Sequence, residues 1–267
     1  MIAGTQRAEN AGVRLAYEMR GAGEPVLLVH GLGYDLRGWG PAPDLLAQEF
    51  QVVLFDNRGV GDSDVPPGPY SVRTLAADAV AVLDAAGCPR AHVLGTSLGG
   101  MIAQEIALGW PERVDRLILA CTTPGGSRAH PMPDRTVRAF ARFLQLPLES
   151  GLRMLVENAL ADATVEGRPE LVDEIYRYRL ANRPPLSGWQ AQAMGAVGFD
   201  AFDRAAEIAA PTLILHGTAD NVVDYRNSEL LAAHIPGARL ELFPGSGHLF
   251  FWEEPDRFAR LVAEFLR

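Results

Sequence analysis

Lysine is absent from this 267-residue sequence, whose 24 basic residues are all arginine. Its absence excludes catalysis through a lysine Schiff base and phosphate binding through a P-loop lysine. The basic residues are outnumbered by 33 Asp and Glu, which gives a net charge of −9. Because nucleic acids and anionic membrane surfaces attract basic protein faces, we expect neither as a partner of this chain.

Cysteines and long apolar runs are also scarce. Cys88 and Cys121 are the only two cysteines, too few for a disulfide framework and without zinc-binding spacing. We therefore expect two buried thiols in a cytoplasmic protein. No segment approaches the ~18 consecutive apolar residues of a membrane helix. The first residues also lack the basic-then-apolar order of a signal peptide, so no export is expected.

The chain does contain a regular series of short apolar runs, as expected for a globular protein that is 48% hydrophobic and 21% charged. Uninterrupted runs of this kind are typical of parallel strands buried on both faces, and helical periodicity separates several of them. An alternating segment at 14–19 predicts an antiparallel strand before them. The predicted parallel strands are 25–29, 51–55, 91–95, 114–120, 211–216 and 239–243.

The alternation predicts an α/β fold with a mostly parallel central sheet and helices on both faces. It is interrupted once. Residues 123–210 contain helical segments and no convincing strand, which predicts a helical cap inserted into a core formed by 1–122 and 211–267. Loops at the carboxyl ends of parallel strands surround ligand sites, so a cap there would cover the site. The expected cap helices are 134–146, 148–160, 169–182 and 188–197.

A G-x-S-x-G pentapeptide, residues 95–99, lies between the predicted strand 91–95 and a predicted helix. A serine at such a turn has a strained backbone that lifts its hydroxyl above the sheet. Gly95 and Gly99 would be required because a side chain would collide across the turn. Ser97 is therefore the candidate nucleophile, although a serine N-cap on an ordinary helix is the simpler alternative.

A serine hydroxyl needs a base to accept its proton. His248 is the best candidate of six histidines, because its loop follows the last predicted strand and reaches the same sheet edge as Ser97. The base in turn needs an acid that orients it. Asp220, after strand 211–216, fills that place, and Asp224 is the second choice. His216 and Asp220 also have a spacing that metal ligands use, but no third ligand is evident, so no metal is expected.

Two backbone N–H groups should bind the negative charge that develops on a carbonyl oxygen under attack. Leu98, directly after the candidate nucleophile, supplies one of them. Leu32, in the sequence His30-Gly31-Leu32-Gly33 after strand 25–29, is the candidate for the other. The alternative is a glycine-rich turn without a ligand. A further glycine-containing segment at 56–63 lacks P-loop spacing, and we expect Arg58 there to pair with a carboxylate or carbonyl.

Taken together, the segments at 30–33, 56–63, 95–100, 216–220 and 245–248 resemble an α/β-hydrolase-fold serine hydrolase with a helical cap. Carboxylesterases, enol-lactone hydrolases and cofactor-free perhydrolases are the most similar groups. The resemblance implies hydrolysis of a carboxylic ester or lactone through an acyl-enzyme, without a cofactor. A serine nucleophile argues against epoxide hydrolases and haloalkane dehalogenases, which use an aspartate.

Two alternatives keep the same fold. A carbon–carbon bond hydrolase of a vinylogous diketone would use the same triad but usually needs polar residues in the cap or the oxyanion loop, and Leu32 and Leu98 supply no side-chain donors. A ligand sensor with slow turnover is the other. The expected partner is a small, largely apolar molecule, and a homo-oligomer is compatible with the sequence. Phe143, Trp189 and Met194, with Phe199, are the candidate substrate contacts in the cap, although aromatic residues at helical spacing often belong to a core.

Overall fold

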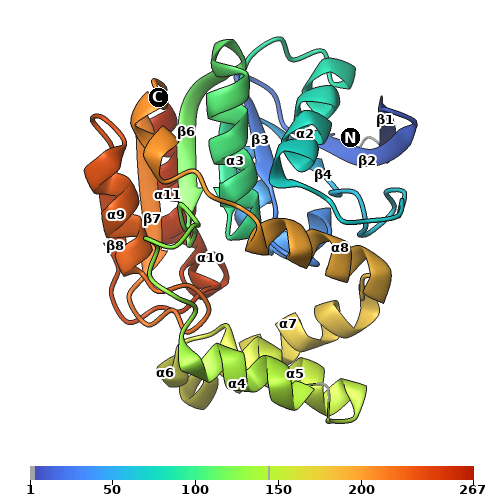
Figure 1. The fold of residues 1–267 in the computed structure, drawn as a ribbon, viewed down its shortest axis with the longest axis vertical. Coiled ribbons are helices and arrows are strands. Elements are labelled where there is room, and N and C mark those ends of the chain that lie inside the picture. Colours follow the sequence, from blue (N-terminus) through green and yellow to red (C-terminus); the bar gives the residue numbers. More distant parts are fainter. Residues whose placement is uncertain (1–3, 144) are drawn as a thin grey trace.

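The computed structural model describes residues 4–143 and 145–267, which form an eight-stranded sheet with helices around it (Figure 1). Strands β1 and β2 are antiparallel and the remaining six are parallel, in the order β1-β2-β4-β3-β5-β6-β7-β8. The bounds are β1 Gln6–Asn10, β2 Val13–Arg20, β3 Pro25–Val29, β4 Gln51–Phe55, β5 Ala91–Thr96, β6 Val114–Ala120, β7 Thr212–Gly217 and β8 Arg239–Phe243.

Both faces of β3, β4, β5 and β7 are buried, which explains their largely apolar sequences, whereas the edge strand β8 is partly exposed and contains Arg239 and Glu241. In β3, Leu27 and Val29 belong to one hydrophobic cluster, whereas Val26 and Leu28 belong to a second cluster on the opposite face. This alternation follows from the two-residue period of a strand. A strand with one solvated face would instead alternate apolar and polar residues.

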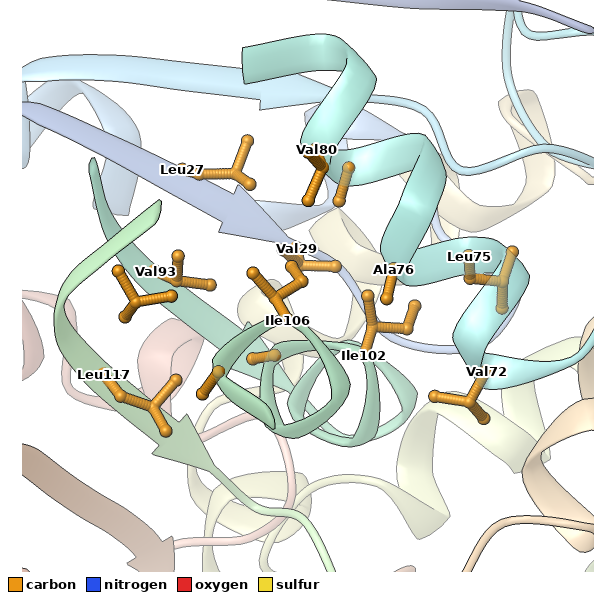
Figure 2. Close-up of a cluster of buried hydrophobic side chains, with 14 of the residues drawn as sticks. Leu27, Val29, Val72, Leu75, Ala76, Val80, Val93, Ile102, Ile106 and Leu117 are labelled. Atoms are coloured by element: carbon orange, nitrogen blue, oxygen red, sulfur yellow. The ribbon is translucent and has the colours of Figure 1, made fainter. Parts of the chain in front are cut away.

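Helices cover each face of the sheet. α2 (Val72–Ala85) and α3 (Leu98–Gly109) pack on one face, where Ile102 and Ile106 meet side chains from the strands (Figure 2). Each buried branched side chain of this kind contributes roughly 1.5–3 kcal/mol relative to exposure. The other helices of the core are the following: α1 Ala42–Leu46, α9 Arg226–His234, α10 Phe250–Glu253 and α11 Pro255–Leu266, with short 3₁₀ turns at Leu36–Trp39, Pro111–Arg113 and Asp203–Glu207.

The start and end of α2 follow from its sequence. Ser71 adopts an extended backbone and its hydroxyl accepts a hydrogen bond from the N–H of Thr74 at 3.0 Å. This side-chain cap satisfies one of the amide groups that an α-helix leaves unpaired at its first turn. After the helix, Gly87 has a φ of +69°, a conformation that glycine adopts readily. The helical spacing of Leu75, Ala79, Val82 and Leu83 predicts a helix over 71–86, and α2 confirms it to within one residue at each end.

Five helices, α4–α8, lie between β6 and β7, and we call them the inserted helices. Figure 1 shows them gathered beyond one end of the sheet, with α8 running back toward α3. The expected helix at 134–146 includes residue 144, which lies outside the described residues. The inserted helices are α4 Asp134–Phe143, α5 Leu148–Asn158, α6 Asp162–Gly167, α7 Pro169–Ala181 and α8 Leu186–Val197.

The two ends of the insertion are joined to each other. Gly125 and Asp200 form an isolated antiparallel bridge, and the N–H of Ala201 donates to the carbonyl of Pro124 at 2.8 Å. Directly after the bridge the chain rejoins the main core, where Ala205 and Ile208 pack in the same cluster as α2 and α3. Residues 199–210, expected within the cap, therefore pack against the sheet domain.

Some elements were not predicted. β1, with the polar sequence Gln-Arg-Ala-Glu-Asn, is an edge strand that has few side chains to bury. The helices α1, α6 and α10 have only five, six and four residues, too short for a periodic pattern to show. Within the described residues, no helix has the length and apolar character needed to cross a membrane.

The tight contact between α3 and the sheet gives a test of the fold. A Cβ at Gly99 would lie 1.9 Å from the carbonyl oxygen of Val29, whereas one at Gly109, in the same helix, would lie 3.9 Å from the flexible end of Arg73. We expect Gly99→Ala to lower the free energy of unfolding by ~3 kcal/mol or more, and Gly109→Ala to leave it within about 1 kcal/mol. Urea unfolding of both variants measures this, and equal midpoints would contradict the packing.

Candidate active site

The three candidate catalytic residues follow strands on one side of the sheet centre. Ser97 comes directly after β5, Asp220 follows β7 and His248 follows β8. The loop at Gly31 follows β3, which pairs with β5. The chain passes from β4, on one side of β3, to β5 on the other side. The carboxyl ends of β3 and β5 therefore form the switch point at which open α/β sheets bind ligands.

The backbone at Ser97 is strained, as predicted. Its φ of 54° and ψ of −119° lie outside the regions that side-chain-bearing residues prefer. The turn is held by a hydrogen bond from the Ser97 N–H to the carbonyl of Ala120 and by one from the Thr122 hydroxyl to the Ser97 carbonyl, at 2.9 and 2.7 Å. A Cβ at Gly95 would lie 2.1 Å from the carbonyl oxygen of Gly99. Glycine is therefore required at positions 95 and 99, because a side chain at either position would overlap backbone atoms.

Asp220 is hydrogen-bonded through both of its oxygens. Oδ2 lies 2.6 Å from Nδ1 of His248 and 3.0 Å from Nε2 of His216. Oδ1 accepts the N–H groups of Val222 and Val223 at 2.7 and 2.9 Å. His216 is in turn fixed by the hydroxyl of Ser228, 2.6 Å from its Nδ1. The carboxylate is thus fully satisfied although its side chain is buried.

These contacts shift the proton affinities of the pair. Burial alone would raise the pKa of Asp220, but the charge and hydrogen bonds of His248 and His216 outweigh it and hold that pKa well below the usual range. Burial would likewise lower the pKa of His248, and the adjacent Asp220 carboxylate instead raises it well above its ordinary value. Asp220 therefore stays ionised and favours the imidazolium form of its partner.

The remaining candidates have other partners. Asp224 forms an ion pair with Arg226 and makes no hydrogen bond to His248 among the described residues. Burial lowers the pKa of His30 to about 3, so this imidazole is neutral, and its Nδ1 accepts the N–H of Gly31 at 2.7 Å.

As expected, Arg58 pairs with a carboxylate, that of the buried Asp78, at 2.6 Å. In the part of the chain that the structure describes, no group of three His, Cys, Asp or Glu side chains is placed to hold a metal ion.

The loop after β3 presents a free amide beside the serine. A Cβ at Gly31 would lie 3.1 Å from the Cβ of Ser97, so the two backbones are in close contact. In this loop the N–H of Gly33 donates to Oε1 of Gln192, on α8, at 3.0 Å. The N–H groups of Leu32 and Leu98 have no acceptor among the described residues. Both predicted oxyanion donors are therefore available.

A cavity of about 430 Å³ lies above these residues, between the sheet edge and the inserted helices. Ser97 and His248 both line it. No hydrogen bond joins their side chains among the described residues, and such bonds are often long without substrate and tighten only in the complex. Trp189, one of the predicted substrate contacts, lines the cavity and packs against Gly33 of the β3 loop.

The structure does not bring Phe143, Met194 or Phe199 to this cavity. Phe143 packs against Gly151 of the next helix, Met194 is 61% exposed, and Phe199 is buried in the main core. For Phe143 and Met194 the reason is the helix face that each occupies, whereas Phe199 lies after the end of α8. On α4 the cavity is lined by Phe140, one turn before Phe143, and α8 faces it with the following residues: Trp189, Ala193, Ala196 and Val197.

Among the cavity residues that were not predicted, two carry a thiol or a charge that bears on the chemistry. Cys121 follows β6 and its buried thiol contacts the His248 imidazole, while burial raises the pKa of that thiol. It lies at the end of a predicted strand, between the strands that carry Ser97 and Asp220, and that position was the available signal. Arg179, on α7, is the other: its guanidinium lies 3.9 Å from the centre of the Tyr34 ring and donates to the carbonyl of Gly33. Nothing in the sequence marks its orientation.

Comparison with known proteins gives the family. Residues 24–255 match the model of the α/β hydrolase fold, and the chain belongs to that family. It is 32% identical to a putative carbamate hydrolase RutD of Azorhizobium caulinodans over 97% of both chains. It is 33% identical to a 2-hydroxy-6-oxo-6-phenylhexa-2,4-dienoate hydrolase of Comamonas testosteroni, over 94% of this chain and 90% of that one.

Among solved structures, Est816, described as an N-acyl homoserine lactone degrading enzyme, superposes with a TM-score of 0.84. It is 32% identical, over 97% of this chain and 100% of that chain. The family and these relatives support hydrolase activity for the chain. They include hydrolases of different bonds, so the bond that this protein cleaves is a separate question.

The raised pKa of His248 predicts a pH dependence. A base acts in its neutral form, so kcat/KM should rise with pH and reach half its maximum above the ordinary histidine value of 6.5. Asp220→Asn removes the charge that raises this pKa. We expect it to lower kcat by ~10⁴-fold and to move the midpoint to lower pH. Rate profiles of wild type and variant test this, and an unmoved midpoint would contradict the assigned pairing.

Proposed function

We propose that this protein hydrolyses a carboxylic ester or lactone through an acyl-enzyme on Ser97. One observation carries the proposal: the Asp220–His248 pair, 2.6 Å apart, opens onto the same cavity as a serine on a strained turn. A nucleophile, a base and an orienting acid are the parts that acyl transfer to serine requires.

The reaction starts with attack of the Ser97 hydroxyl oxygen on the substrate carbonyl carbon, while His248 accepts the hydroxyl proton. The carbonyl oxygen becomes negatively charged and is bound by the N–H groups of Leu32 and Leu98. Collapse of this intermediate expels the alcohol, which takes the proton from His248. A water molecule, deprotonated by His248, then attacks the acyl carbon. The bond to the Ser97 oxygen breaks, Ser97 recovers the proton from His248, and the acid is released.

The cavity limits the substrate. Its lining is mostly apolar, from side chains such as Met101, Leu152, Val156 and Phe251, and its volume is about 430 Å³. A space of this size suits a small to medium, largely apolar acyl or lactone group. The lactone-degrading activity in the description of Est816 supports the same class of substrate.

The test of the mechanism is Ser97→Ala, assayed with p-nitrophenyl esters of short and medium chain length. We expect the rate to fall by ~10⁶-fold, because only the oxyanion site and binding remain. Ser187→Ala, at an exposed position on α8, is the matched control and should keep the wild-type rate. Ester turnover that survives in the Ser97→Ala variant would refute the assignment of Ser97 as the nucleophile.

A second function has one observation in its favour. Arg179 lines the cavity and forms no salt bridge with a carboxylate among the described residues. A substrate that carries a carboxylate, as the dienoate of the Comamonas relative does by its name, would provide one. Hydrolysis of a carbon–carbon bond in such a compound would use the same triad. Leu32 and Leu98 lack side-chain donors for it, so the ester or lactone remains the first proposal.

A substrate comparison separates the two functions. We expect wild-type kcat/KM to be higher for p-nitrophenyl butyrate than for a 2-hydroxy-6-oxohexa-2,4-dienoate. The reverse order would favour carbon–carbon cleavage. In that case Arg179→Gln should lower kcat/KM for the anionic dienoate by roughly tenfold more than for the neutral ester, because a charge-assisted hydrogen bond is lost.

A further inference from the structure

Glu253, at the end of α10, connects two parts of the molecule that are far apart in sequence. Its carboxylate is buried, and Oε2 accepts the N–H of Gly247 at 2.6 Å. Oε1 accepts the N–H of Ala161 at 2.9 Å. Gly247 immediately precedes His248, and Ala161 is the N-cap residue of α6, one of the inserted helices. A single side chain therefore holds the loop of the candidate base and the insertion together.

The same loop is held on its other side. The N–H of Leu249 donates to the carbonyl of Ala159 at 3.1 Å, so the residues before and after His248 are both tied to the α5–α6 connection. There is no space between the two segments, since a Cβ at Gly247 would lie 2.5 Å from the nitrogen of Ala161. Arg168 adds a hydrogen bond to the Glu253 carbonyl at 2.8 Å.

The arrangement requires a carboxylate. Both oxygens of Glu253 accept hydrogen bonds from backbone N–H groups. A glutamine at this position would therefore turn its NH₂ group toward the N–H of either Gly247 or Ala161. A buried donor without an acceptor costs about 1–3 kcal/mol, and the loop would relieve that cost by moving. A shift of ~1 Å at a catalytic group can reduce a rate by ~10²-fold.

We propose that Glu253 is a positioning residue that sets the location of His248 and makes it depend on the inserted helices. The proposal rests on the proposed function, because it assigns His248 the role of base. Its consequence is mechanical: a movement of the α5–α6 connection, which borders the cavity through Asn158 and Ala159, also moves the imidazole. Seating of a substrate beneath the insertion and alignment of the base are then one event.

The experiment compares Glu253→Gln with Glu254→Gln. Glu254 is the next residue, and its carboxylate accepts the Ser246 hydroxyl at 2.5 Å and pairs with Arg257, without a hydrogen bond to Gly247 or Ala161. Turnover of p-nitrophenyl butyrate is normalised to sites titrated with a fluorophosphonate. We expect Glu253→Gln to lower kcat by ~10²-fold with KM within a factor of about three, and Glu254→Gln to stay within twofold of wild type. The fluorophosphonate should also label Ser97 more slowly in the first variant.

A second measurement does not use activity. The His248 Nδ1 proton shared with Asp220 should give a downfield proton resonance that is absent from His248→Ala. Glu253→Gln should broaden or lose this resonance under conditions in which Glu254→Gln retains it. If Glu253→Gln does not fold, Glu253→Asp, which can reach only one of the two N–H groups, replaces it in both measurements.

The outcomes are distinguishable. A lower melting temperature with unchanged kcat per titrated site and an unchanged resonance would show that Glu253 is only structural and would overturn the proposal. Wild-type ester turnover that does not depend on Ser97 would instead overturn the proposed function. In that case the resonance alone decides whether Glu253 positions His248.

Discussion

At the start of α3 the backbone of the helix touches the backbone of the sheet. A side-chain carbon at Gly99 would overlap the carbonyl at the end of β3, and one at Gly95 would overlap Gly99 itself. This contact accompanies the strained, positive-φ backbone of Ser97 and brings the first turn of the helix against the loop at Gly31. The helix, the candidate nucleophile and the oxyanion amides thus share one geometric origin, which is the close packing of α3 on the sheet.

The charged groups near this contact are held in place by hydrogen bonds. Asp220 is buried, but four donors surround its two oxygens, so the cost of desolvating the carboxylate is offset by hydrogen bonds. His216 serves this purpose from within β7, although in sequence it resembles a metal ligand. Because the acid is fixed from below by His216 and by backbone amides, the imidazole of His248 is the part of the pair that remains exposed to the cavity.

The sheet and its edge were predictable because they depend on local signals. Short apolar runs identified the parallel strands, although the sequences of β6 and β8 are interrupted by charged residues, and the strand–serine–helix order located Ser97 without knowledge of any contact. The inserted helices other than α6 were predicted as helices, but not the faces they turn to the cavity. Phe143 and Met194 differ from Phe140 and Trp189 only by rotation about a helix axis, and packing between helices, which involves distant residues, sets that rotation. Arg179 escaped prediction for the same reason.

The bridge between Gly125 and Asp200 has a consequence for variation in this protein. The insertion leaves the sheet domain and returns to it at one place, so the strands that carry the reactive groups are continuous on either side of it. Beyond that place the inserted helices are attached again: Arg179 on α7 and Gln192 on α8 hydrogen-bond to the loop after β3, and the α5–α6 connection is bound to Glu253. Exchange of other side chains on these helices would alter which molecules fit, whereas the three attachments would have to be preserved, and they mark the limit of that modularity.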